Sequence, residues 1–150
     1  MANLLLFVCT GNTCRSPLAE GMALQWLENN GYKGWEVASA GTLAADGSPT
    51  SKGTVDALRN WGIEYSGSSA PITKELVDRA TAVLCMTSSQ CLEVASLTQQ
   101  PNKIELLDLD GGIIDPVGCN QSVYDALAER IAELIPLRLA SIIKQYDNKE

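Results

Sequence analysis

Four short apolar segments alternate with helical ones along the chain, and this alternation restricts the fold more than any other feature of the sequence. The predicted strands are Leu4–Val8, Glu36–Ala40, Thr81–Met86 and Ile104–Leu107. The first is apolar at every position, which is typical of a strand buried on both faces of a sheet. Because strands that alternate with helices form parallel sheets, the sequence predicts a three-layer α/β fold with helices on both faces of a four-stranded parallel sheet.

Helical periodicity fills the segments between the predicted strands. The predicted helices are Ser16–Glu28, Ser51–Asn60, Thr73–Asp78, Ser89–Leu97 and a last helix from about Ser122 to Tyr146. Pro17 suits the first turn of the first helix, and Thr73 is the expected N-cap of the third. Pro136 lies inside the last helix, and we expect it to kink or split that helix. The 150 residues contain no repeat or linker, which predicts one domain over residues 1–150.

The first predicted strand runs directly into a loop that opens the first helix. The loop reads Cys9-Thr10-Gly11-Asn12-Thr13-Cys14-Arg15-Ser16-Pro17. The combination of Cys, five residues, Arg and Ser, with Gly two positions after Cys, arises by chance on the order of 0.001 times in a chain of this composition. Parallel sheets bind ligands beyond the carboxyl ends of their strands, where this loop lies. The loop is therefore the candidate functional site.

The residue types in this loop suit the binding of a tetrahedral anion. A short loop closing onto a helix start turns backbone N–H groups inward, and the helix dipole adds positive potential. Gly11 is expected to supply torsions that a side chain forbids, and Asn12 tolerates left-handed torsions. Arg15 offers a planar fork for two phosphate oxygens. We expect Cys9 to lose its proton readily in this field, with Ser16 stabilising the thiolate as a nucleophile.

The chain contains no histidine, which excludes Ser-His-Asp triads, Cys-His pairs and histidine-metal sites. A thiolate that attacks a phosphoryl group needs an acid to protonate the leaving group, and a carboxylate is then the natural choice. Asp115 is favoured because Pro116 restrains the loop after the fourth strand. Asp108 and Asp110 in the same loop remain alternatives.

Composition limits the partners and the compartment. Acidic residues outnumber Lys and Arg by 18 to 11, giving a formal net charge of −7, so we expect no nucleic-acid partner. The amino terminus lacks a basic region, and no apolar run approaches ~18 residues, so we expect no membrane partner and a cytoplasmic location. The five cysteines match no zinc spacing, so we expect neither a metal ion nor another cofactor.

Further segments along the chain complete a known pattern. They are Val8–Pro17, Ala19-Glu20, Ser39–Thr42, Ala57-Leu58, Gly62-Ile63, Met86 and Asp115-Pro116. With them the sequence resembles the low-molecular-weight protein tyrosine phosphatase family over essentially its full length. The resemblance implies a flavodoxin-like sheet, with Cys9 as nucleophile, Arg15 as phosphate clamp and Asp115 as general acid.

The resemblance also assigns roles around the loop. It implies that Asn12, Ser16 and Ser39 join a hydrogen-bond network that holds the loop. It suggests that Cys9 and Cys14 pair as a reversible disulfide that protects the nucleophile. The residues expected to bind the phosphoryl group are Thr10, Gly11, Asn12, Thr13, Cys14 and Ser16. The substrate is then a phosphorylated protein, and inorganic phosphate is a product.

Departures from the family pattern bear on the substrate. Thr13 stands where other members carry an aliphatic residue, and this threonine, with Met86-Thr87, resembles the protein arginine phosphatase branch. Val117-Gly118 replaces aromatic residues that flank a phosphotyrosine ring, although the arginine branch usually keeps an aromatic residue there. The bracing histidine expected near Ser68 is absent. We therefore favour phosphoarginine, with phosphotyrosine or aryl phosphate close behind, while Thr13 as a neutral replacement remains open.

A redox enzyme is the alternative from another class. Thioredoxin-coupled arsenate reductases share this fold and pass oxidation from the loop cysteine to two further cysteines. Cys85 and Cys91 lie where such a relay would sit, although their spacing is shorter and burial explains both more simply. The outer rim is not fixed by the sequence, and its candidates are Trp35, Leu43, Asp46 and Tyr124.

Overall fold

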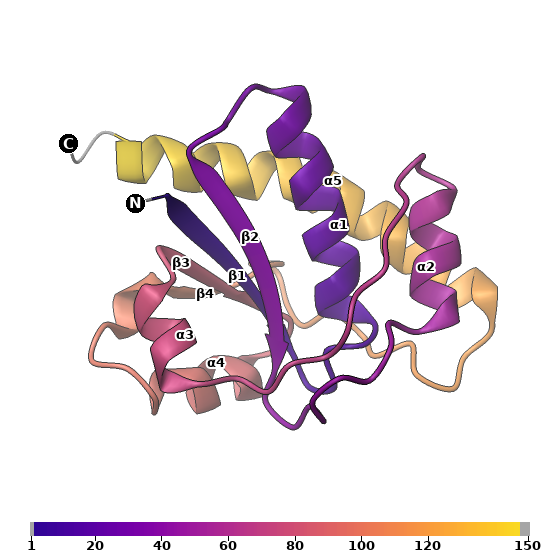
Figure 1. Cartoon of the computed structure of the whole chain (residues 1–150), viewed down its shortest axis with the longest axis horizontal. Helices are drawn as coiled ribbons and strands as arrows, with labels where there is room; N and C mark the ends of the chain where they lie inside the picture. Colours follow the sequence, from indigo (N-terminus) through magenta and orange to yellow (C-terminus); the bar gives the residue numbers. More distant parts are fainter. Residues whose placement is uncertain (1, 148–150) are drawn as a thin grey trace.

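A sheet of four parallel strands forms the middle layer of the molecule, and the computed structural model that shows it describes residues 2–147 (Figure 1). Its order is β2 (Trp35–Gly41), β1 (Asn3–Cys9), β3 (Ala82–Cys85) and β4 (Ile104–Leu106). The predicted parallel sheet is confirmed. Because β1 pairs with β2 on one side and with β3 on the other, the strand order reverses at β1, and its carboxyl end is the switch point at which such folds bind ligands.

Helices cover both faces of this sheet. One face carries α1 (Arg15–Asn29), α2 (Lys52–Arg59) and α5 (Gln121–Asp147), and the other carries α3 (Lys74–Arg79) and α4 (Ser88–Ala95) (Figure 1). A short 3-10 turn, Pro101–Lys103, leads into β4. The Thr73 hydroxyl accepts a hydrogen bond from the Leu76 N–H, so Thr73 is the N-cap of α3, as predicted. The predicted elements are all present, with bounds that differ by at most two residues.

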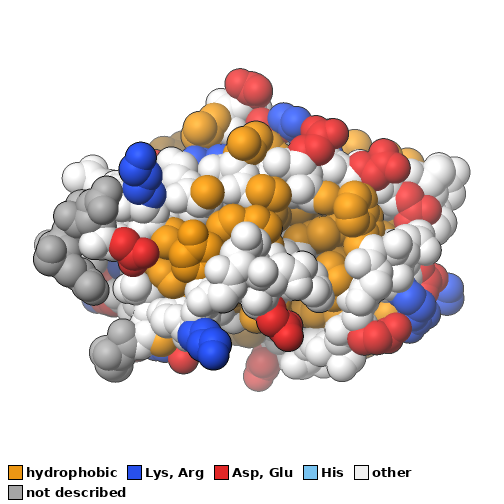
Figure 2. Space-filling view, turned by 90° about the horizontal axis from the view of Figure 1, so that it is seen from above, with side chains coloured by type: hydrophobic (Ala, Val, Ile, Leu, Met, Phe, Trp, Pro, Cys, Tyr) orange, Lys and Arg blue, Asp and Glu red, His pale blue; other side chains and the backbone are white. Residues whose placement is uncertain are grey.

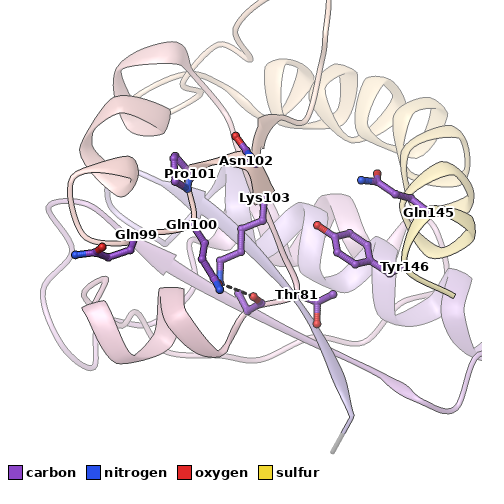
Figure 3. Close-up of a pocket in the computed structure, with 9 residues that line it drawn as sticks. Thr81, Gln99, Gln100, Pro101, Asn102, Lys103, Gln145 and Tyr146 are labelled. Carbon is purple, nitrogen blue, oxygen red and sulfur yellow. Dashed lines mark hydrogen bonds between the residues drawn. The ribbon is translucent and has the colours of Figure 1, made fainter. Parts of the chain in front are cut away.

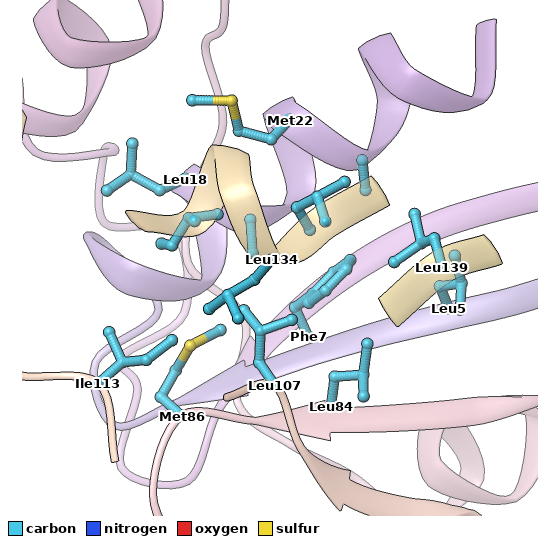
Figure 4. Packing of buried hydrophobic residues seen from close by; sticks show 14 of the residues in the cluster. Leu5, Phe7, Leu18, Met22, Leu84, Met86, Leu107, Ile113, Leu134 and Leu139 are labelled. Atoms are coloured by element: carbon cyan, nitrogen blue, oxygen red, sulfur yellow. The ribbon is translucent and has the colours of Figure 1, made fainter. Parts of the chain in front are cut away.

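Side chains of β1 enter two separate cores, which explains its uninterrupted apolar sequence. Leu5 and Phe7 face α5, where Leu134 and Leu139 pack toward them (Figure 4). The alternate residues of the strand pack against α3, α4 and their neighbours on the other face, and these are Leu4, Leu6 and Val8. With a core on either side, β1 can neither slip nor rotate, and Cys9 at its end is held in place.

Pro136 does not split the last helix, which was one of the two outcomes expected of it, because α5 is continuous from Gln121 to Asp147. Proline interrupts a helix by removing one N–H donor and crowding the preceding turn. Here Leu134 and Ile135 before it, and Leu139 after it, are buried in the core, while Pro136 itself faces solvent. Core packing on both sides of the proline therefore outweighs its local cost, and the helix is not split.

Hydrophobic side chains are exposed over α1 and α5. Figure 2 shows hydrophobic side chains gathered at the centre of the face seen from above in Figure 1. A hollow of about 290 Å³ opens between α1, α5 and the turn that carries Trp61 and Ile63. The side chain of Trp61 is about half exposed. This surface uses no residue of the loop after β1. Within residues 2–147, no helix is both long enough and apolar enough to cross a membrane.

Candidate active site

The chain turns from β1 into α1 at the carboxyl end of the central strand. Strand β1 ends at Cys9, and α1 begins at Arg15. Cys14, the N-cap residue of α1, makes no side-chain capping hydrogen bond, and the first turn of α1 carries no acidic residue. The positive end of the helix dipole therefore has no anionic side chain of its own to neutralise it, which is the condition for binding an anion there.

Four backbone carbonyl groups of the segment from Cys9 to Cys14 accept hydrogen bonds from residues outside it. The pairs are Thr42 N–H to Cys9 O (2.9 Å), Leu43 N–H to Thr10 O (3.0 Å), Ser51 N–H to Thr13 O (2.9 Å) and the Thr54 hydroxyl to Cys14 O (3.2 Å). With these acceptors bonded outside the loop, the Asn12 N–H points into it and donates to the Cys9 Sγ. This is the nest geometry that cradles an oxyanion.

The Cys9 thiol lies in the middle of the loop and is 2% exposed. Its Sγ accepts a hydrogen bond from the Asn12 backbone N–H at 3.3 Å and lies 2.9 Å from the Ser16 hydroxyl oxygen. Hydrogen bonds donated to sulfur stabilise a thiolate over a thiol. The predicted contact between Cys9 and Ser16 is therefore present, with a backbone donor beside it.

Asn12 holds the bend of the loop. Its φ is +57°, the left-handed conformation expected for it. Its amide nitrogen donates to the hydroxyls of Ser16 (2.8 Å) and Ser39 (2.9 Å), and its amide oxygen accepts from the Ala70 N–H (2.8 Å). The torsion argument for Gly11 was wrong, because Asn12 takes the left-handed position and the φ of Gly11 does not lie in that region.

Behind Ser39 lies the half-buried carboxyl group of Glu20, a residue that matched the family pattern in the sequence but received no role there. The Ser39 hydroxyl donates to Glu20, and the Tyr65 hydroxyl donates to the same oxygen at 3.2 Å. Burial raises the pKa of Glu20 above its ordinary value, against the lowering effect of those two hydrogen bonds. Burial also raises the pKa of Tyr65. Tyr65 thus partners Glu20 in a chain whose bracing histidine is absent. The sequence signal for Glu20 was the Ala19-Glu20 match to the family pattern, and nothing in the sequence pointed to Tyr65.

Arg15 turns its guanidinium along the mouth of the loop. It is 5% exposed, and its Nη1 donates to the Ile113 carbonyl at 2.9 Å. Its Nη2 donates to the Thr10 hydroxyl at 3.5 Å and lies 3.7 Å from the Asp115 carboxylate. The structure therefore brings Asp115 to the loop, 100 residues after Arg15 in the sequence.

Two of the three candidate acids, Asp115 and Asp108, have different partners in the structure. The Asp115 side chain is 49% exposed, and its Oδ1 accepts from the Val117 N–H at 3.1 Å, which fixes the turn. The Asp108 carboxylate is paired with Arg130 at 2.9 Å and also accepts from the Asp110 N–H. Of the two, Asp115 is the carboxylate that contacts Arg15, so the geometry favours it over Asp108.

Gln90, in the first turn of α4, is a second residue that the sequence analysis missed. Its side-chain oxygen accepts from the backbone N–H groups of Met86 and Thr87, and its nitrogen donates to the Thr10 hydroxyl at 3.0 Å. The Thr87 hydroxyl accepts from the Gln90 N–H, which completes a capping box. The spacing Thr-x-x-Gln is a sequence signal for such a box, although it does not reveal the contact with the loop.

The remaining cysteines have different surroundings. The Cys14 thiol lies within 3.3 Å of the Ser51 hydroxyl and 3.5 Å of the Tyr124 hydroxyl. All five cysteines are free thiols. Cys85 is fully buried in the core against α4, and burial raises the pKa of its thiol. Cys91 is partly buried, and burial raises the pKa of its thiol as well. Residues 2–147 contain no group of three or more Cys, Asp and Glu side chains arranged to hold a metal ion.

Of the four residues expected at the rim of the pocket, three lie at the loop end of the sheet or are exposed near it, and Trp35 does not. Leu43 is 80% exposed, and its N–H binds the loop at Thr10. Asp46 is also exposed, while Tyr124 is buried beside Cys14. Trp35 is not at the rim, because it begins β2 at the opposite end of the sheet and packs edge-on against Tyr146.

Other cavities, besides the hollow beside Trp61, also lie away from the loop. One of about 490 Å³ opens at the amino ends of β3 and β4, where Lys103 donates to the carbonyls of Asp78 and Ala80 (Figure 3). It lies at the wrong end of the sheet for the Cys9 loop. Another, of about 430 Å³, is largely apolar and lies between α5 and the segment that leads to Asp115, including Ile113 and Ile114.

Comparisons with known proteins agree with this geometry. The family model described as low molecular weight phosphotyrosine protein phosphatase matches residues 4–148. A protein-arginine-phosphatase of Geobacillus stearothermophilus is 41% identical over 137 residues, which cover 87% of this chain and 90% of that protein.

Solved structures are similar over nearly the whole chain. The YwlE arginine phosphatase, as a cysteine-to-serine mutant with a phosphorylated active-site serine, superposes with a TM-score of 0.90 at 31% identity, covering 98% of this chain and 99% of that one. A low molecular weight protein tyrosine phosphatase from T. tengcongensis gives a TM-score of 0.88 at 35% identity, covering 93% and 99%.

Proposed function

Since this chain belongs to the low molecular weight phosphotyrosine protein phosphatase family, we propose that it hydrolyses phosphorylated protein side chains through a phosphocysteine at Cys9. The observation that carries the proposal is the placement of the thiol. Sγ lies at the centre of an anion-binding loop, within hydrogen-bonding distance of the Asn12 N–H and the Ser16 hydroxyl. A tetrahedral phosphoryl group seated on the N–H groups of this loop presents its phosphorus to that sulfur.

In the first step the Cys9 thiolate attacks phosphorus, and the bond from phosphorus to the side-chain oxygen or nitrogen breaks. The electron pair of that bond goes to the leaving atom, which takes the proton from Asp115. Arg15 and the loop N–H groups hold the equatorial oxygens as their charge develops. The 3.7 Å contact between the Asp115 carboxylate and the Arg15 guanidinium supports placing the acid and the phosphate-binding arginine side by side at the opening of the loop.

In the second step water attacks the phosphorus of the phosphocysteine. Asp115, now a carboxylate, takes a proton from that water, and the sulfur–phosphorus bond breaks to restore the thiolate and release inorganic phosphate. The phosphorylated active-site serine in the cysteine-to-serine mutant of YwlE, a similar structure, supports a covalent phosphoryl intermediate.

We favour phosphoarginine as the substrate. Relatives at 41% and 33% identity are named protein-arginine-phosphatases. Thr13 lies half-buried in the loop wall with its hydroxyl 3.7 Å from Cys14 Sγ, where an aliphatic side chain would offer no polar atom. Val117 is 63% exposed beyond Asp115, so this side of the mouth lacks an aromatic wall for a phosphotyrosine ring.

The Thr13→Ile substitution tests the substrate preference. We expect wild-type enzyme to turn over phosphoarginine peptides with a higher kcat/KM than phosphotyrosine peptides. The substitution should lower the phosphoarginine value by about tenfold, because a hydroxyl is removed from a site built for a polar substrate, and leave the phosphotyrosine value unchanged. A wild-type preference for phosphotyrosine, with no effect of Thr13→Ile, would reject phosphoarginine.

Cys9→Ser tests the reaction itself. The hydroxyl is a far weaker nucleophile than the thiolate, so turnover of either substrate should fall to background. Turnover that survives this substitution would reject the phosphocysteine route.

The arsenate reductase alternative gains no support from the relatives described above, which carry phosphatase names. Cys85, one member of the relay that it requires, is fully buried. We also propose a cytoplasmic location, because a reducing compartment keeps the Cys9 nucleophile as a thiol.

A further inference from the structure

Gln90 is a polar side chain with only 2% of its surface exposed, and it lies between α4 and the loop after β1. An apolar side chain of similar size would fill the same space, so the neutral amide of Gln90 is present for its hydrogen bonds. A buried polar group is retained at a cost unless every hydrogen bond is made.

The orientation of this amide is fixed. The backbone N–H groups of Met86 and Thr87 both donate to the Gln90 Oε1 at 3.0 Å. Because backbone N–H groups can only donate, the oxygen must face them, and the Nε2 group must face Thr10. The contact of 3.0 Å between Nε2 and the Thr10 hydroxyl oxygen is therefore a donation to that oxygen.

Thr10 receives a second donor on the same oxygen. The Arg15 Nη2 lies 3.5 Å from it and, like the amide nitrogen, can only donate. Both acceptor positions of the hydroxyl are thereby used, and the Thr10 side chain is held between α4 and the guanidinium.

Arg15 has few other restraints at this end. Its Nη1 is fixed by the Ile113 carbonyl at 2.9 Å. Its Nη2 has the Thr10 hydroxyl on one side and the half-exposed Asp115 carboxylate, 3.7 Å away, on the other. Without a firmly held Thr10, Nη2 is free to turn toward Asp115 and away from an anion in the loop.

We propose that Gln90 is a positioning residue that acts through Thr10 to hold the Arg15 guanidinium in place for the phosphoryl group. This inference rests on the proposed function, in which Arg15 binds that group. Gln90 touches neither the substrate nor Cys9, so its loss weakens anion binding and leaves the contacts of the nucleophile unchanged.

A double-mutant cycle tests the proposal in the full chain. Thr10→Val removes the shared acceptor. Gln90→Met removes the Nε2 donor at similar length, together with the Oε1 that accepts from Met86 and Thr87, and the third variant carries both changes. The measurements are kcat and KM for p-nitrophenyl phosphate and the inhibition constant for inorganic phosphate. Each single change should raise the inhibition constant for phosphate by about tenfold. The double variant should have the same inhibition constant as the single variants, because both changes break the same link from Gln90 through Thr10 to Arg15.

Two further variants provide controls. Thr10→Ser keeps the hydroxyl and should restore phosphate inhibition to within about twofold of wild type. Thr87→Ala weakens the same helix start without touching the amide contact to Thr10, so it should lower the melting temperature and leave the inhibition constant unchanged.

Different outcomes would reject the role of Gln90 and the phosphatase function on which it rests. Multiplying effects in the double variant, or an equal loss in Thr87→Ala, would overturn the role of Gln90. If Gln90→Met does not fold, the two Thr10 variants carry the test. Thr10→Val must then weaken phosphate inhibition and Thr10→Ser must leave it intact. Any other result overturns the proposal. Residual turnover in Cys9→Ser would instead refute the proposed function.

Discussion

Asn12 connects the nucleophile to a half-buried carboxyl group, that of Glu20, through a line of hydrogen-bonded side chains. Its amide nitrogen donates to Ser16 beside Cys9 and to Ser39, and Ser39 donates in turn to Glu20. Each member has a partner on either side, so the line is a fully satisfied polar network inside the fold. A change at Glu20 therefore reaches the loop through hydrogen bonds, although Glu20 itself touches neither Cys9 nor Arg15 in the structure.

The raised pKa of Glu20 predicts a pH-dependent contribution to stability. Its ordinary value is 4.5, and burial raises the pKa in the folded state. As the pH rises above about 4.5, the carboxyl ionises first in the unfolded chain, so stability falls until the pH has passed the raised pKa. Glu20→Gln keeps the accepting oxygen and does not titrate.

Thermal unfolding from pH 4.5 to 8 checks this prediction. The melting temperature of Glu20→Gln minus that of wild type should become more positive as the pH rises, since the other groups titrate in both proteins and cancel. A difference that stays constant over this range would show that burial does not perturb Glu20.

Asp115 is expected to matter most when the leaving group is poor. Asp115→Asn cannot supply a proton, so release of an alkoxide-like or basic leaving group should slow by roughly 100-fold, while a good leaving group such as p-nitrophenolate slows far less. The measurement is single-turnover release from aryl phosphates of graded leaving-group acidity. An equal loss for good and poor leaving groups would remove Asp115 from the role of acid.

At the scale of elements, the end of β2 supports the loop. Gly41 is the last residue of β2, and its N–H donates to the Ala70 carbonyl. A Cβ at this position would lie 2.4 Å from the Thr10 carbonyl oxygen and 3.0 Å from the Asn12 nitrogen. The loop can therefore approach β2 this closely only because residue 41 has no side chain.

Gly41→Ala should consequently displace the loop. We expect a loss of roughly 1–3 kcal/mol in the free energy of unfolding from overpacking and a fall of at least about tenfold in kcat/KM, because small displacements of reacting groups are costly. Chemical denaturation and steady-state kinetics measure both. Gly34→Ala is the matched control, since nothing lies within 4 Å of its added Cβ. Similar behaviour of the two variants would contradict the argument.

At the scale of the whole molecule, the site joins segments from most of the chain. The loop after β1 is bonded to the start of α2, to the segment around Ala70 and to α4, while Arg15 reaches the segment before Asp115. The chain carries a net charge of −7, but the local charge at the loop is positive, because Arg15 and the positive end of the α1 dipole lie there. A bound anion therefore stabilises contacts between distant parts of the chain.

Inorganic phosphate should stabilise the entire fold. At a concentration 100 times its dissociation constant, it should raise the free energy of unfolding by about 2.7 kcal/mol, which for a chain of this size is a rise of several degrees in melting temperature. Arg15→Ala should abolish most of this shift, whereas Glu129→Gln, on the exposed face of α5, should retain it. An equal phosphate effect in both variants would indicate binding elsewhere.

Much of the site could be predicted because it is local in sequence. Cys9, Asn12, Arg15 and Ser16 lie within eight consecutive residues between a strand and a helix, so their types and spacing already define an anion-binding loop with a nucleophile. The alternation of strands and helices likewise predicts the parallel sheet, since apolar periodicity is the signal that burial imposes on a chain.

Pro136 and Gln90 show what sequence patterns could not supply. Local propensity predicts a break at Pro136, yet burial of its neighbours in the core keeps α5 continuous. Gln90 reads as a capping residue, and nothing local shows that its amide also meets Thr10, 80 residues away in sequence.

The sequence by itself determined the chemistry of the loop and the class of fold, because both depend on interactions between near neighbours. Only the tertiary structure decided what supports that chemistry. The contact between Tyr65 and Glu20 spans 45 residues, and the approach of Asp115 to Arg15 spans 100. Such pairs form when β1 is placed between β2 and β3, since sheet pairing and core packing bring distant segments to one strand end, and local patterns do not encode those distances.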